Sequence, residues 1–107
     1  MPVIGTFAAV ETGYTGSLNT LTLKADVAIL PNEHNAGRNA PDFRVMAGAV
    51  EVGVAWRRSS LGAQTVVLRV KLDDPTLPEP IWGALLKPGP DGIARLVWRR
   101  DWEDERD

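Results

Sequence analysis

The sequence predicts a small all-β domain, either a partly open barrel of OB-like character or a compact sandwich, with six to seven short antiparallel strands. Three observations lead to this class. Apolar residues alternate with polar ones in several short segments, Gly and Pro separate these segments, and no window carries a ten-residue helical stripe. Such a pattern is typical of strands that each bury one face in a shared core.

The first strand is expected at residues 4–10, and Gly13 and Gly16 are interpreted as the break before the next strand. The second strand shows the clearest alternation in the chain, with apolar residues at every other position: Leu21, Leu23, Ala25, Val27 and Ile29. Residues 31–41, rich in Pro and Asn, are expected to form a loop.

Three further strands are expected on the same grounds. Residues 43–47 place Phe43, Val45 and Ala47 on one face, and this strand ends at Gly48. Residues 81–86 and 93–98 flank a Pro-Gly-Pro-Asp-Gly sequence, which is a strong turn signal. Trp98 then lies on the core face of the last strand, whereas Trp82, next to Ile81, is a candidate edge or interface residue.

The clearest local unit is a hairpin formed by residues 50–57 and 66–72. A turn over 59–63 opposes Arg58 and Gln64, and it creates four apolar cross-strand pairs on one face: Val50 with Leu72, Val52 with Val70, Val54 with Leu68, and Trp56 with Val66. A slip of one residue would set apolar side chains against polar ones. We therefore expect this face, including Trp56, to lie in the core.

The opposite face of the hairpin is the candidate binding surface. It combines small residues, Gly53 and Ala55, with cations, and Lys71 opposes Glu51 in this register. Two interpretations stay open: a shallow groove for single-stranded nucleic acid, or a surface covered by another strand or a dimer partner, with the arginines reaching water. The candidate nucleic-acid-binding residues are Arg44, Arg57, Arg58, Arg69 and Lys71.

Charge is distributed unevenly along the chain. The net charge is −2, from 12 basic and 14 acidic residues, but residues 44–71 hold five bases and one acid. Residues 99–107 hold five acids and three Arg around Trp102. We therefore expect one domain, residues 1–98, followed by a charged tail, residues 99–107, which either anchors a partner through Trp102 or masks the basic face.

Residues for most kinds of catalysis are missing. The chain has no Cys, and its single His, His34, together with scattered acids makes a poor metal set. Asp73 and Asp74 precede Pro75 and are interpreted as turn residues, and neither Ser59 nor Ser60 has a neighbouring base. We expect a protein that is not an enzyme and has no cofactor or metal. Because no export signal or membrane-length apolar run is present, a cytoplasmic location is expected.

Several short motifs occur in order: Gly13-Tyr14-Thr15-Gly16, Pro41-Asp42-Phe43-Arg44-Val45, Glu51-Val52-Gly53-Val54-Ala55-Trp56 and Val70-Lys71-Leu72-Asp73-Asp74-Pro75. On these motifs, residues 4–86 resemble a bacterial family known as domain of unknown function 736. The resemblance implies a setting among plasmids and integrative elements of alphaproteobacteria, with no known reaction or cofactor. It also implies an aromatic residue where this chain has Val67, which removes a base-stacking candidate.

Two functional hypotheses follow. The first is a non-catalytic binding module of mobile-element biology that binds single-stranded or structured nucleic acid through the basic hairpin face. The alternative is a protein–protein interaction module, an adaptor or an inhibitor of a host defence or conjugation machine. It would act through a strand edge or the charged tail, with Trp82 and Trp102 as contact residues.

Overall fold

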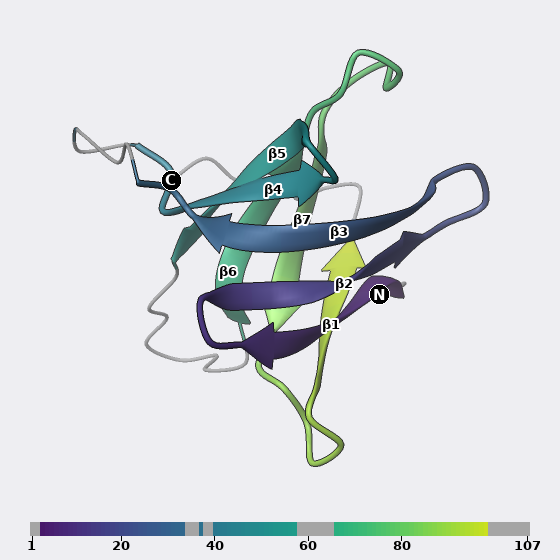
Figure 1. Ribbon diagram of the computed structural model, residues 1–107. Coiled ribbons are helices and arrows are strands. Elements are labelled where there is room, and N and C mark those ends of the chain that lie inside the picture. Colours follow the sequence, from purple (N-terminus) through teal and green to yellow (C-terminus); the bar gives the residue numbers. More distant parts are fainter. Residues whose placement is uncertain (1–2, 34–36, 38–39, 58–65, 99–107) are drawn as a thin grey trace.

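The protein is described by a computed structural model that covers residues 3–33, 37, 40–57 and 66–98, and this part of the chain is entirely β (Figure 1). Each strand pairs antiparallel with the next one in sequence, and β8 pairs with β1, so that the sheet closes into a barrel. The predicted all-β class is confirmed, with closure replacing the partly open form. The strands are β1 (Val3–Val10), β2 (Gly13–Asn19), β3 (Lys24–Pro31), β4 (Phe43–Ala47), β5 (Val50–Arg57), β6 (Val66–Leu72), β7 (Ile81–Leu86) and β8 (Ile93–Trp98).

The sequence interpretation missed one of the eight strands, β2. Its residues Gly13 and Gly16 were interpreted as a break, but both lie within the strand. Gly16 pairs with Phe7 of β1 and with Val27 of β3, so its Cα hydrogens face the barrel interior. A Cβ at this position would collide with the carbonyl oxygen of Thr6. Glycine is therefore required here because two strands approach closely, and not because the chain turns.

The barrel interior is filled by apolar side chains from all eight strands, which are aliphatic except for Phe7 and Phe43. Its largest fully buried residues are Ile29, Val45, Val70, Leu85 and Leu96. Large residues face small ones across the strands: Gly53 pairs with Leu72, and Ala55 pairs with Val70. An eight-stranded barrel has an interior just wide enough for side chains, so alternating large and small residues fill it without overlap.

Most of the predicted strands agree with the structure. The bounds of β7 and β8 are those expected, and Phe43 and Val45 are buried as expected. Trp98 packs against the core cluster. Leu21 is the exception, because it is 97% exposed. The backbone N–H of Leu23 donates to Thr20 Oγ1, 3.0 Å away, which makes a turn of residues 20–23 and delays the start of β3.

Two aspartates hold turns by accepting hydrogen bonds. Asp74, one of the adjacent pair in the sequence, accepts from both the backbone N–H and the hydroxyl of Thr76, and these bonds lower the pKa of its carboxyl. Asp91 accepts from Arg95 Nη2 at 2.9 Å and from the Ile93 N–H at 3.0 Å, and these bonds lower the pKa of Asp91 below its ordinary value of 3.8. The interpretation of Asp74 as a turn residue is thus confirmed.

In the part of the chain that is described, no helix is long and apolar enough to cross a membrane.

Replacement of Gly53 by Ala tests the close approach of strands. A Cβ at Gly53 would collide with the backbone of Lys71 on β6, whereas one at Gly89 would meet Asp91 Oδ1 at 3.4 Å and Arg95 Nη1 at 3.9 Å, both ordinary contact distances. We expect Gly53→Ala to lower the free energy of unfolding by about 1–3 kcal/mol, and the control Gly89→Ala to change it by about 0.5 kcal/mol or less. Urea denaturation measures both, and equal effects would contradict the packing described here.

The pH dependence of stability tests the Asp91 turn. Because the pKa of Asp91 is lower in the folded than in the unfolded chain, its contribution is present above pH 3.8 and is lost as the pH falls through the folded pKa. Thermal denaturation between pH 2.5 and 6 should show a shallower acid loss for Asp91→Asn than for the wild type. Asp26→Asn, on the exposed surface of β3, is the control, and an unchanged slope for Asp91→Asn would contradict the assignment.

Candidate functional site

The register of β5 against β6 differs from the predicted hairpin by three residues. Ala55 pairs with Val70 and Trp56 pairs with Arg69, so an odd shift exchanges the two faces of β5. The core face of β6 is the predicted one, because Leu68, Val70 and Leu72 are all buried. On β5 the prediction was wrong: Gly53 and Ala55 face the core, whereas Val54 and Trp56 face outward.

The barrel's limited interior volume explains the exchange. The predicted pairing would place Val54 and Trp56 against Leu68 and Val66, four large side chains in a space that also holds side chains of the other six strands. The observed pairing sets Ala55, which is 0% exposed, against Val70, and leaves Val50 58% exposed. A bulge between Val45 and Met46 further shifts β4 against β5. The predicted turn over 59–63 lies outside the described residues.

The shift brings two tryptophans and two cations onto one outer surface. Lys71 pairs with Trp82 across β6 and β7, and Trp56 pairs with Arg69 across β5 and β6. The indole rings of Trp56 and Trp82 stack with their centroids 5.9 Å apart and an interplanar angle of 22°. We name these four residues, Trp56, Arg69, Lys71 and Trp82, the cation–aromatic face. It lies on the outer side of β5, β6 and β7, the far wall in Figure 1.

Trp82 is the centre of this face. The guanidinium carbon of Arg69 lies 4.8 Å from the centroid of the Trp82 ring, and Lys71 Nζ lies 5.5 Å from it. Both distances are within the range of cation–π attraction. All four side chains are partly exposed, so the indole rings and the two cations reach the outer surface at the same place. Trp82 was predicted as an edge or interface residue; β7 pairs with both β6 and β8, so it is not an edge strand, and the interface alternative stays a prediction.

Arg57 does not join the face. Its side chain is on the opposite side of β5 from Trp56, and its guanidinium stacks over Phe43 at 4.9 Å from the ring centroid. Its backbone N–H donates to Asp42 Oδ2 at 2.8 Å, and Nη1 lies 3.8 Å from Asp42 Oδ1. The expectation that Arg57 and Arg69 share one surface is therefore wrong.

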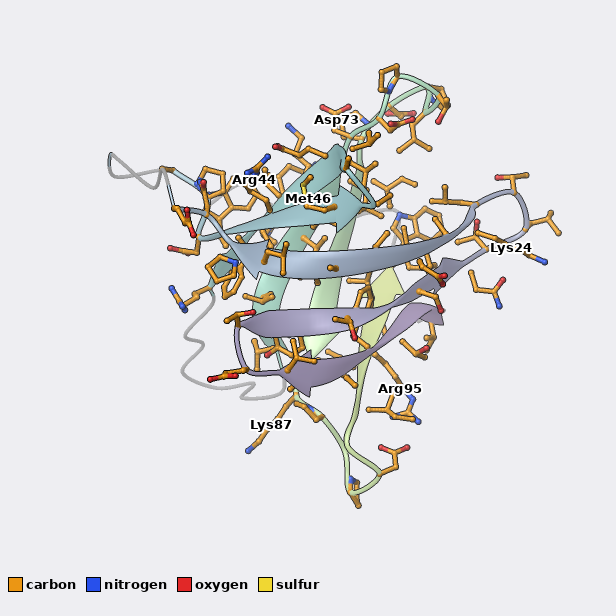
Figure 2. The ribbon with its side chains drawn as sticks, in the orientation of Figure 1. Lys24, Arg44, Met46, Asp73, Lys87 and Arg95 are labelled. Carbon is orange, nitrogen blue, oxygen red and sulfur yellow. The ribbon has the colours of Figure 1, made fainter. Side chains whose placement is uncertain are left out.

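The remaining predicted site residues divide between the outer surface and the undescribed part of the chain. Arg44 shares an outward row with Val54 and Lys71, and its Nε lies 3.0 Å from Glu51 Oε1. Glu51 was expected opposite Lys71, so this pairing is corrected. Figure 2 shows Arg44 and Met46 along β4. The other predicted contacts, Arg58 and Trp102, lie outside the described residues, as do His34, Ser59 and Ser60.

Gly53 marks the approach of a neighbouring strand and not of a ligand. It is buried, and the space of a Cβ is filled by the backbone of β6. Val67, which stands where an aromatic was expected, packs partly against the core. The interpretation in which another strand covers Gly53 and Ala55 is thus the correct one, with the strand supplied by the barrel itself.

Trp56 is the site residue that sequence reasoning missed. The alternation of Val50, Val52, Val54 and Trp56 indicated a core face, but hydrophobicity alone does not measure the room inside. The sequence signal for the observed register was the size of the side chains that face each other across β5 and β6. The strand with Leu68, Val70 and Leu72 needs a neighbour that turns small residues inward, and Gly53 and Ala55 are the small residues of β5.

A hollow at one end of the barrel offers few polar groups that could bind a ligand. It is lined mainly by aliphatic residues, including Leu23, Val52, Leu72 and Leu77, and Asp74 is its ionisable lining residue. The Asp74 carboxylate already accepts two hydrogen bonds from Thr76. Within the described ranges, no three His, Asp or Glu side chains gather in a way that would hold a metal ion.

Fold and surface together define a class of protein, a small closed antiparallel β-barrel with an external cation–aromatic face. The chain belongs to the family described as protein of unknown function (DUF736), whose profile matches residues 3–101. Neither a curated protein nor a solved structure matches the chain.

Lysine substitutions at adjacent residues test the register that creates the face. Ala55→Lys would put a charge into the barrel, and we expect it to cost more than about 3 kcal/mol of unfolding free energy or to prevent folding. Val54→Lys points outward and should cost about 1 kcal/mol or less. Circular dichroism with urea denaturation separates the two variants. The predicted hairpin register requires the reverse order, which would contradict the observed pairing.

Proposed function

We propose that the protein is a non-catalytic module that binds single-stranded nucleic acid through the cation–aromatic face. One observation carries the proposal: two stacked tryptophans and two cations occupy the same outer surface of three adjacent strands. The correction of the register strengthens the case, because the hairpin face expected from the sequence had cations but no aromatic residue on which a base stacks.

The chemistry of the face suits an unpaired strand. Base–aromatic stacking contributes about 1–3 kcal/mol per base and works for any base, because every base has a π face. Arg69 and Lys71 lie beside the Trp82 ring and supply charges for the phosphates on either side of a stacked base. Bases inside a duplex already stack on each other, so the face favours single strands.

The local charge supports the proposal despite a net charge of −2. Lys71 forms no ion pair with any of the residues that the structure describes, because Glu51 pairs with Arg44. The charge of Lys71 is therefore available to a phosphate. A positive patch of this kind raises the local concentration of a polyanion even where the whole protein is slightly acidic.

The alternative of a protein–protein interaction module has fewer routes than the sequence suggested. Because β1 pairs with β8, none of the eight described strands lies at a free edge of the sheet. Strand addition by a partner has no template there. The routes that remain are the outer-surface residue Trp82 and the charged segment 99–107 with Trp102. The expected cytoplasmic location, and the role in mobile-element biology that the family resemblance implies, remain part of the proposal.

Fluorescence anisotropy with labelled single- and double-stranded oligonucleotides tests the proposal. We expect salt-sensitive binding of the single strand, with a slope of log affinity against log salt of about −1.4, since each of two neutralised phosphates contributes about −0.7. Arg69→Ala/Lys71→Ala should remove most of this slope. Trp82→Ala should weaken binding by roughly 5- to 150-fold at every salt concentration, which corresponds to the stacking energy of one base.

A matched control removes two charges elsewhere. Lys24 at the start of β3 and Lys87 just after β7 are exposed and lie far apart in Figure 2. The double variant Lys24→Ala/Lys87→Ala has the same net charge as Arg69→Ala/Lys71→Ala and should bind like the wild type. If folded wild-type protein gives flat titrations at low salt, or if the two double variants lose affinity equally, the proposed function is wrong.

A further inference from the structure

The chain leaves the barrel next to the cation–aromatic face. Pairing between β7 and β8 ends where Gly83 meets Trp98, and Trp82 is the residue that precedes Gly83. Trp98, the last described residue, therefore lies beside the end of β7 that carries Trp82. This proximity of Trp98 to Trp82 follows from the register of β7 against β8 alone.

The outer surface between this exit and the cations is apolar. Ala84 and Val97 pair with each other across β7 and β8, and Ala84 pairs with Arg69 on β6. Because their neighbours Leu85 and Leu96 face the core, Ala84 and Val97 face outward. Both are nevertheless buried, at 6% and 3% exposed, and neither belongs to the core cluster. These two outward side chains are thus shielded from water, which is the environment that an apolar covering group provides.

Residues 99–107 match this surface in charge, chemistry and length. They hold five acids, three Arg and Trp102, and four of the acids lie within three residues of Trp102; the facing surface has two cations and an adjoining apolar strip. The four residues from Trp98 to Trp102 span at most about 14 Å when extended. Two strand spacings, from β8 to β6, measure about 10 Å. Trp102 and the acids around it therefore reach Arg69 and Lys71.

We propose that residues 99–107 dock on the cation–aromatic face of their own chain. The carboxylates lie against Arg69 and Lys71, and Trp102 covers the apolar strip of Ala84 and Val97. The segment thereby competes with a nucleic acid for the same cations. This competition rests on the proposed function, whereas the docking itself does not.

The test compares two full-length triple variants with equal net charge. Glu103→Gln/Asp104→Asn/Glu105→Gln removes three charges that flank Trp102. Glu11→Gln/Asp26→Asn/Glu33→Gln removes three exposed charges on or beside β1–β3. In ¹H–¹⁵N spectra at low salt, we expect the first variant to shift the indole N–H resonances of Trp56 and Trp82, and the control to leave them unchanged. Trp102→Ala, which keeps the charge, should shift them as well.

The second readout is the affinity for a labelled single-stranded oligonucleotide. The variant in 99–107 should bind at least about fivefold more tightly than the control triple variant, a change at the lower end of ordinary coupling between two sites. Because both triple variants gain the same net charge, a general electrostatic effect raises both affinities equally.

The two readouts separate the two proposals. Unchanged indole resonances in both the acid variant and Trp102→Ala would overturn the docking, whatever the oligonucleotide does. Shifts that depend on protein concentration would assign the segment to a second copy and overturn docking within one chain. Concentration-independent shifts without any oligonucleotide binding at low salt would support the docking and refute the proposed function.

Discussion

The interior volume of a closed eight-stranded barrel is the constraint on which the structure depends. Pairing of β1 with β8 closes the sheet, and the space inside then has room for a limited set of side chains. Leu72 and Val70 of β6 occupy this space because Gly53 and Ala55 of β5 leave it free. Gly16 of β2 plays the same part on the other side of the barrel, where β1 comes too close for any Cβ.

This constraint also produces the candidate site. The interior is already filled by aliphatic residues together with Phe7 and Phe43, and the larger Trp56 and Trp82 both occur on the outer side of their strands. Outside, the two rings stack on each other and lie beside Arg69 and Lys71, which reduces the apolar area exposed to water while leaving an aromatic surface accessible. The same packing that excludes the tryptophans thus assembles them with the cations.

Closure further decides how a partner can bind. With no free edge among the described strands, recognition by backbone hydrogen bonds has no template, and side chains on the outer surface must provide the contacts. The cation–aromatic face has both charges and π surface within one small area. The described chain ends at Trp98, which pairs with Gly83 beside Trp82, so the register of β7 and β8 brings the end of the last strand to this face.

Local patterns in the sequence were sufficient for the all-β class, for the bounds of β7 and β8, and for the inward residues of β3, β4 and β6. Apolar–polar alternation and turn residues act over a few positions, so their effect can be predicted without knowing which strands pack nearby. The strand β2, the orientation of β5 and the pairing of Trp56 with Arg69 depended on how much space the closed barrel leaves. The interior volume of the barrel is filled jointly by all eight strands, so it cannot be inferred from the sequence of any one segment. These features are therefore decided only when the strands pack together.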